Sequence, residues 1–530
     1  MSDVTVAPPG VRRRRLRGLS AVVAALSLVT GVAMTALLPA DAGTTPAGAV
    51  KAPAGLASLR WGACPSATDD ARMRCATVRV PLDYRHPQRR AIDVMISRIP
   101  AAKPEQRQGA IILNGGGPGA NLNIPLVASR LPDLADSYDL IGFDPRGTGH
   151  STPMSCGRTR DELIRDEELE LLAFPAADGS IGRNLGYAHR VARQCAAHSG
   201  DLLPYLNTAD IARDLDRIRV ALGEPTVSFY GQSWGTYLGA VYRTLFPSTI
   251  DRMVLDSAMD PGRIGYDEFR DFSAGMQDRW PDLADAAVDN AGTVGLGTTP
   301  TQVRRNYLAL TSRLDRHPVR RDGTAAPVTG NLIRLLTRQY SLNANLADLL
   351  GLWAAAVRLD AGTATDADHA LVETAATTFV TANLAPGVPD DNWLSIPWAV
   401  SCGDQAWPRD ARTYARNTAA DRSAHPLTAG APANITPCAA WPVRPAAPAT
   451  TVTSTGRRNV LILQNRRDPA TPLRSAMGMR RALGTDAAFV DIDAGGHGVI
   501  SQPQPNMCAV FTMHDFFMDG ALPAADTTCQ

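Results

Sequence analysis

The sequence predicts an α/β fold with a mostly parallel β-sheet and a large helical insertion. Three observations lead to this prediction. Short apolar runs rich in β-branched and aromatic residues alternate with helical patterns, as in a parallel sheet covered by helices. These runs lapse over a long helical stretch and return near the C-terminus. The chain has 530 residues, more than one hydrophobic core usually holds, so an insertion or a second domain is expected.

Short runs with the length and composition of strands are each followed by turn residues. They cover residues 92–96, 110–113, 138–143, 227–230, 253–255, 459–464 and 487–492. Residues 206–222 place apolar side chains on one helical face and charges on the other, which predicts an amphipathic helix ending at Gly223. This helix leads into the strand at 227–230.

The pattern also predicts the domain organisation. Residues 60–265 and 445–530 are expected to form two parts of one core, and residues 266–444 a helical lid inserted between them. Residues 1–42 are expected to be a signal peptide.

Arginines at 12–15 and 17 precede an uncharged apolar run over 19–38, which is the layout of an export signal. Ala40 and Ala42 are small residues at the positions that a signal peptidase reads, so we expect cleavage near Ala42 and a secreted protein without further membrane contact. The alternative is an uncleaved anchor, because about 20 apolar residues can span a bilayer.

The composition limits the function classes. The formal net charge is +1 and the basic residues are scattered, so a nucleic-acid partner is not expected. An even number of cysteines fits an oxidising compartment. The simplest pairing joins neighbours in order, although the sequence does not determine it: Cys64 with Cys75, Cys156 with Cys195, Cys402 with Cys438, and Cys508 with Cys529. Zinc binding is the alternative, but no CxxC pair supports a metal site.

A nucleophile motif stands between a predicted strand and a predicted helix. Residues 231–235 read Gly-Gln-Ser-Trp-Gly and match G-x-S-x-G. In this context the motif is typical of the strand-to-helix turn of α/β-hydrolases, which exposes a serine nucleophile. We therefore predict Ser233 as the nucleophile. A glycine-rich turn without chemistry is the alternative.

A serine hydroxyl needs a base and an orienting carboxylate. Asp468 follows the strand at 459–464, and His497 lies in a glycine-rich loop after the strand at 487–492. The order Ser, Asp, His is the one that this fold uses. The chemistry needs no cofactor. The alternatives are His514 or His198 as the base and Asp491 or Asp493 as the acid, with Asp468 and His497 as ordinary surface groups.

The glycine-rich loop at 114–119 directly follows the strand at 110–113. Bare backbone N–H groups in such a loop can stabilise an oxyanion. We expect one N–H from Gly116 or Gly117, together with that of Trp234, to form the oxyanion hole. The alternatives are a plain turn or a phosphate loop, but the Lys-Ser/Thr ending of a phosphate loop is absent.

Three motifs together resemble one family. They are Gly-Gly-Pro-Gly at 116–119, Asp-Pro-Arg-Gly-Thr-Gly-His-Ser at 144–151, and the motif at 231–235. The combination is similar to the proline iminopeptidase and tripeptidyl aminopeptidase group of α/β-hydrolases, over the core but not over the lid. Gly115 stands where the iminopeptidase pattern has His, so the tripeptidyl branch fits better.

The resemblance implies a secreted serine aminopeptidase that releases short peptides, in this branch tripeptides, from free N-termini through an acyl-enzyme. It also implies that acidic groups of the lid grip the substrate's amine, for which Asp404, Glu268 and Asp260 are candidates. Ordinary surface acids are the alternative interpretation of all three. Asp144 and Arg146 are expected to brace the loop beneath the active site.

Two other functions stay open. A carboxylesterase or lipase can use the same triad, because the fold does not determine which acyl group is attacked. An inactive surface-binding protein that keeps the scaffold is the other possibility. The sequence makes no prediction of the oligomeric state.

Overall fold

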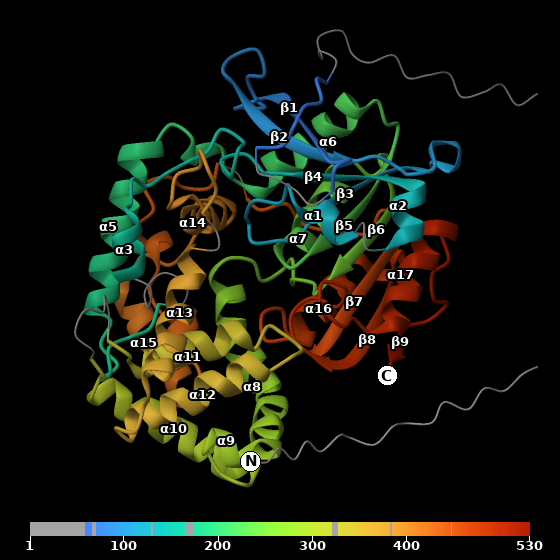
Figure 1. The fold of residues 1–530 in the computed structure, drawn as a ribbon. Coiled ribbons are helices and arrows are strands. Elements are labelled where there is room, and N and C mark those ends of the chain that lie inside the picture. The colour runs from blue at the N-terminus through green and yellow to red at the C-terminus, as the bar shows by residue number, and fades with distance from the viewer. Residues whose placement is uncertain are drawn as a thin grey trace, which may run out of the picture. The chain divides into compact units, whose positions relative to one another are not determined.

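A twisted sheet with helices on both faces forms the centre of the computed structural model (Figure 1). The structure describes residues 59–65, 70–128, 131–165, 173–320, 327–381, 384–446 and 448–530. The predicted signal peptide and its cleavage site near Ala42 lie outside these residues. No helix in the described part of the chain is long and apolar enough to cross a membrane.

The described residues form nine strands in one sheet, and all seven predicted strands are among them. In spatial order they are β1 (Arg74–Pro81), β2 (Ala91–Ile99), β4 (Tyr138–Phe143), β3 (Gly109–Asn114), β5 (Val227–Gln232), β6 (Ile250–Asp256), β7 (Val460–Arg467), β8 (Ala487–Gly495) and β9 (Thr527–Cys529). Only β1–β2 and β2–β4 pair antiparallel. The prediction of a mostly parallel sheet is therefore confirmed.

The chain changes direction across the sheet between β3 and β5. The chain runs from β3 outward to β4 and then crosses back to pair β5 with β3. Where the chain leaves two neighbouring parallel strands toward opposite sides, the carboxyl ends of these strands border a crevice. Ligands bind in such crevices in α/β folds. This topology places the loop after β3 beside the turn after β5.

Successive side chains of the inner strands point to opposite faces of the sheet, and helices cover both faces. In β3, Ile112 packs on one face, whereas Ile111 and Leu113 pack on the other. The first face carries α6 (Thr208–Leu222), α7 (Trp234–Leu245) and α16 (Leu473–Leu483), and the second carries α1 (Ile124–Ala128), α2 (Pro132–Ser137) and α17 (Met507–Asp519). As predicted, α6 ends at Gly223, which caps it in a left-handed conformation.

The insertion contains a second hydrophobic core. It is built by α8 (Tyr266–Asp289), α9 (Ala291–Val294), α10 (Pro300–Arg316), α11 (Gly330–Tyr340), α12 (Ala347–Asp360) and α13 (Asp366–Thr381). At its centre Trp353 Nε1 and the Tyr307 hydroxyl donate hydrogen bonds of 2.9 and 3.0 Å to Thr337 Oγ1, so the polar ends of both rings are satisfied. We call the segment from α8 to α15 the cap.

The last part of the cap belongs to the core of the sheet instead. This part contains α14 (Asn392–Asp404) and α15 (Ala411–Ala424), and side chains such as Trp398 and Tyr414 belong to the same hydrophobic cluster as those of β1 and α7. Between β4 and α6 the chain adds α3 (Arg160–Arg165) and α5 (Gly182–Ser199). Short 3₁₀ turns lie at Pro104–Gln106, Leu203–Tyr205, Ala431–Ala433, Pro437–Ala440 and Gly484–Asp486. The boundaries proposed for the lid remain a prediction.

Disulfides join Cys64 to Cys75, Cys156 to Cys195, Cys402 to Cys438, and Cys508 to Cys529. These are the neighbour pairs expected from the chain order. Cys156–Cys195 ties α5 to the loop after β4, and Cys402–Cys438 ties α14 to the 3₁₀ turn at Pro437–Ala440.

Arg146 joins the loop after β4 to α6 and to the β1–β2 hairpin. Its guanidinium is fully buried and forms two hydrogen bonds with the Asp214 carboxylate, of 2.6 and 2.7 Å. It also donates to the carbonyl of Leu82 at 3.0 Å, and the Tyr84 hydroxyl donates to Asp214 at 2.7 Å. Arg146 therefore braces this edge of the sheet from the interior rather than as a solvated ion pair.

Replacing one partner of this pair should destabilise the fold. Asp214→Asn leaves a buried guanidinium without its counter-charge, which typically costs about 3–5 kcal/mol. Urea unfolding measures the loss. Asp216→Asn is the matched control, because Asp216 pairs with Arg219 near the surface of the same helix and should change the free energy of unfolding by less than about 1 kcal/mol. Equal losses in the two variants would contradict this assignment.

Candidate active site

Ser233 occupies a strained turn between β5 and α7. Its φ of 57° and ψ of −128° are unusual for a residue with a side chain. Gly231 and Gly235 flank it because there is no room for a Cβ: one on Gly231 would overlap the Gly235 carbonyl, and one on Gly235 would lie 2.6 Å from the Asn114 carbonyl oxygen. The turn thus aims the serine hydroxyl into the crevice at the start of α7.

Neighbouring hydrogen bonds hold the strained backbone. The Ser233 N–H donates to the carbonyl of Asp256 at 3.0 Å. Its own carbonyl accepts from the N–H of Thr236 at 2.9 Å and from the Thr236 hydroxyl at 2.6 Å. Strain of this kind persists only where the surroundings fix it, as they do here.

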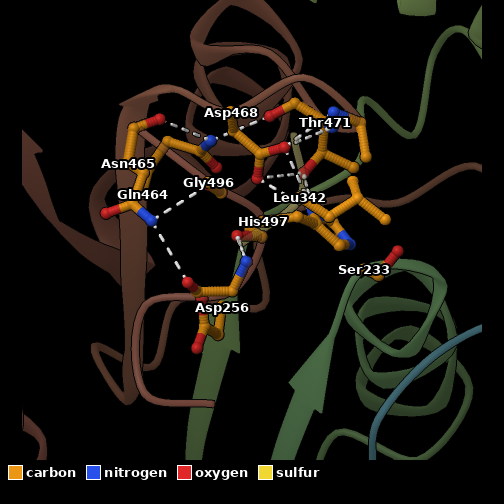
Figure 2. A network of polar contacts seen from close by, with 12 residues as sticks. Ser233, Asp256, Leu342, Gln464, Asn465, Asp468, Thr471, Gly496 and His497 are labelled. Carbon is orange, nitrogen blue, oxygen red and sulfur yellow. Dashed lines mark hydrogen bonds and ion pairs between the residues drawn. The ribbon is translucent and has the colours of Figure 1, made fainter. Parts of the chain in front are cut away.

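The structure brings Asp468 and His497 together beside Ser233 (Figure 2). His497 Nδ1 lies 3.0 and 2.9 Å from the two carboxylate oxygens of Asp468. Figure 2 shows the Ser233 side chain pointing toward the imidazole from the opposite side. A proton on Nδ1 directed at the carboxylate leaves Nε2 free to accept the serine proton.

Asp468 is held in its ionised form. It is fully buried, and burial alone would raise the pKa of its carboxyl. The adjacent His497 and hydrogen bonds from the N–H groups of Ala470 and Thr471 outweigh this effect, so the net shift of the pKa is downward. A buried carboxylate in this state orients the imidazole and stabilises the imidazolium that forms during catalysis.

The glycine loop lies against the nucleophile, as the topology requires. A Cβ added to Gly116 would lie 2.8 Å from the Ser233 Cβ, so only glycine permits this approach. The Gly116 N–H, however, donates to Asn114 Oδ1 at 3.0 Å. Among the described residues the amides of Gly117 and Trp234 have no acceptor, which makes these two the better candidates for an oxyanion hole.

Sequence reasoning missed Asp256 and Ser257, which hold the loop carrying His497. The buried Asp256 carboxylate accepts from the N–H groups of Val499 and Ile500 at 2.8 and 3.0 Å. Ser257 Oγ accepts from the Gly498 N–H at 2.8 Å. Asp256 is the last residue of β6 and Ser257 follows it, but no motif marks them, because their partners lie more than 240 positions away.

The other candidates for base and acid are engaged elsewhere. His514 is half-buried on α17 and contacts Asp133 and Asp515, and His198 contacts the Gln194 carbonyl on α5. Asp491 pairs with Arg466, and Asp493 with Arg467. None of these contacts involves Ser233.

Two of the three acids proposed to bind the substrate lie near each other. Burial raises the pKa of Asp404 to about 7, although hydrogen bonds from the Thr208 N–H and hydroxyl, both 2.6 Å, oppose the shift. Burial, Asp271 and Asp404 together raise the pKa of Glu268 to about 8. Both carboxylates also act on the buried hydroxyl of Tyr237, one turn after Ser233. Both carboxyls therefore change their ionisation near neutral pH.

Asp404 also lines a polar cavity of about 360 Å³. Tyr237 and Asn207 are among its other lining residues, but Ser233 and His497 are not. Trp234 connects the two places, since its indole N–H donates to Thr208 Oγ1 at 3.2 Å and this hydroxyl donates to Asp404.

Asp260, the third acid, is not part of this pair. It lies in a separate surface depression with Arg263, Arg474 and Arg481, and its carboxylate is 3.9 Å from Arg481. The described residues contain no group of three or more His, Cys, Asp or Glu side chains that could hold a metal ion.

Comparisons with known proteins point to hydrolases. A family model described as TAP-like protein matches residues 425–529. A tripeptidyl aminopeptidase of Streptomyces coelicolor is 34% identical over 466 residues, covering 86% of this chain and 83% of the relative. Carboxylesterase B of Mycobacterium tuberculosis is 31% identical over 97% of this chain and 99% of the relative. The serine protease Hip1 of the same species is 26% identical, covering 89% and 91%.

Removing the charge of Asp468 should disable the site without unfolding the protein. Asp468→Asn favours the wrong tautomer of His497, and in serine proteases the equivalent change lowers kcat by about 10⁴-fold. Asp491→Asn is the control, because Asp491 pairs with Arg466 and accepts from the Thr528 hydroxyl, both away from Ser233, and it should keep full activity. Labelling of Ser233 by a fluorophosphonate measures both variants. Loss of labelling in Asp491→Asn instead would make that residue the acid.

Proposed function

Because the chain belongs to the tripeptidyl aminopeptidase family of serine α/β-hydrolases, we propose that it is a secreted enzyme that releases tripeptides from free N-termini. The arginine-rich and apolar N-terminal segment and the four disulfides support secretion, since disulfides persist in oxidising compartments. Peptides with a free N-terminus are the proposed substrates. No cofactor takes part in the proposed reaction.

The observation that carries this proposal is the acid pair, which is connected through Thr208 to Trp234, the residue that follows Ser233. Asp404 lies close enough to Glu268 to raise the pKa of its carboxyl, and an ionised carboxylate here suits a substrate ammonium group. The indole N–H of Trp234 donates to the Thr208 hydroxyl, and this hydroxyl donates to Asp404.

The triad then performs acyl transfer. Ser233 Oγ attacks the carbonyl carbon of the third residue while His497 Nε2 takes the hydroxyl proton. The N–H groups of Gly117 and Trp234 stabilise the oxyanion. His497 gives its proton to the leaving amine, the C–N bond breaks, and a tripeptidyl ester remains on Ser233. Water, deprotonated by His497, then attacks the ester carbonyl; the bond to Ser233 Oγ breaks, His497 returns the proton to Ser233 Oγ, and the tripeptide leaves with a free carboxylate.

An esterase is the second candidate, because one relative of similar identity is named carboxylesterase B. The same three residues would attack an ester. The free amine separates the two functions, since an ester substrate needs no ammonium group. An inactive surface-binding protein is less favoured, because Ser233, Asp468 and His497 lie together.

A substrate panel decides between peptidase and esterase. The mature chain should hydrolyse tripeptidyl chromogenic amides with a free amine, and blocking the amine should abolish turnover. Ser233→Ala should lower kcat by about 10⁶-fold, as nucleophile removal does in subtilisin. Turnover of a short-chain ester alone, equally dependent on Ser233, would move the protein to the esterases.

The acid pair should give the free-amine substrate its own pH dependence. Below the raised pKa values the carboxyls are protonated and neutral, so KM for the free-amine substrate should fall as pH rises from 6 to about 7, where the substrate's α-amine is still charged, whereas KM for the ester should not. Asp404→Asn should raise KM for the free-amine substrate by about tenfold or more and weaken this dependence. Asp267→Asn is the control, because Asp267 is exposed beside Glu268 and pairs with Arg270. An unchanged KM in Asp404→Asn would remove Asp404 from the amine site.

A further inference from the structure

The cap contacts the catalytic histidine through its backbone. The loop between α11 and α12 contains Leu342, whose carbonyl accepts a 2.7 Å hydrogen bond from the His497 N–H (Figure 2). From the side of the sheet, Asp256 and Ser257 hold the three residues that follow His497. The loop that carries the base is thus held between the sheet and the cap.

Gln502 completes the contact from the cap side. Its side-chain amide donates to the His497 carbonyl at 2.6 Å and to the Leu342 carbonyl at 3.2 Å. Its side-chain carbonyl accepts from the Ala344 N–H at 2.9 Å. One half-buried glutamine therefore joins both sides of the contact with three hydrogen bonds.

A buried arginine holds the same cap loop from behind. Arg279 of α8 donates to the carbonyls of Ser341 and Asn343, at 3.2 and 2.8 Å, and pairs with Asp282. Asp282 also accepts from Arg467 at 2.8 Å, and Arg467 directly precedes Asp468. A chain of contacts therefore leads from Arg467, next to Asp468, through Asp282 and Arg279 to the cap loop that contacts His497.

The glycines before His497 are adapted to this arrangement. A Cβ on Gly495 would overlap the Arg279 guanidinium. Gly496 has a φ of +109°, and a Cβ there would lie 3.0 Å from the Leu342 carbonyl oxygen. Side chains at these two positions would push the cap loop away from the base.

We propose that Gln502 is a positioning residue, and that the loop between α11 and α12 is part of the catalytic apparatus rather than a removable cover. Gln502 touches no reacting atom. It acts by fixing the His497 backbone, and therefore the imidazole, relative to Ser233. Small displacements of a catalytic group can lower the rate by up to about 100-fold. The proposal concerns the proton transfer from Ser233, whichever acyl group is attacked.

Gln502→Met tests the proposal, because methionine has a similar length but forms none of the three hydrogen bonds. We expect kcat for the best substrate to fall by about tenfold with KM changed less than about twofold. The rate of fluorophosphonate labelling of Ser233 should fall by a similar factor. Labelling does not depend on peptide specificity, so this result can be read even if the tripeptidase proposal fails.

Gln277→Met is the matched control. Gln277 is also a half-buried glutamine, on α8, and its side chain accepts from Arg304 within the cap. This variant should keep the kcat, KM and labelling rate of the unmodified chain. Both variants should keep the melting temperature within a few degrees. An unchanged kcat and labelling rate in Gln502→Met, or a raised KM with unchanged kcat, would overturn the proposal.

Discussion

The strained backbone of Ser233 is the constraint on which the carboxyl edge of the sheet depends. A residue with a positive φ stays in place only where its neighbours allow nothing else. Gly231, Gly235 and Gly116 leave space for the surrounding backbone to approach, and the Asp256 carbonyl accepts the serine N–H. The pairing of β3, β5 and β6 supplies all of these contacts, so the nucleophile is positioned by the sheet itself.

Asp256 extends this constraint to the base. Its backbone holds Ser233, whereas its carboxylate holds the loop after His497 and accepts from the Tyr230 hydroxyl at 2.8 Å. Burial raises the pKa of this carboxyl, and the hydrogen bonds oppose the shift. Since one residue touches both loops, the distance between nucleophile and base is set at the end of β6.

Local signals explain what the sequence could predict. The strands, α6 and the three triad positions each follow from a periodic pattern or a motif within a few residues. Gln502, Asp256 and Arg279 act through partners far along the chain, and no short pattern marks them. The sequence also made the Gly116 N–H a candidate oxyanion donor. In the structure this N–H donates to the Asn114 side chain instead. The packing of α14 on the sheet likewise depends on the tertiary fold.

One helix of the cap, α8, carries both a member of the proposed amine site and the arginine that supports the loop against His497. Glu268 lies in the first turn of α8, near Asp404, and Arg279 lies three turns further, where it supports the loop against His497. A shift of α8 that moved Glu268 away from Asp404, which lies on α14, would therefore also move the support of the His497 loop. If the acid pair binds the substrate's amine as we propose, substrate preference is better altered by changing these two side chains than by moving α8. Residues of the cap that face its own core can vary. Glu268 and Arg279, in contrast, are linked because both lie on α8.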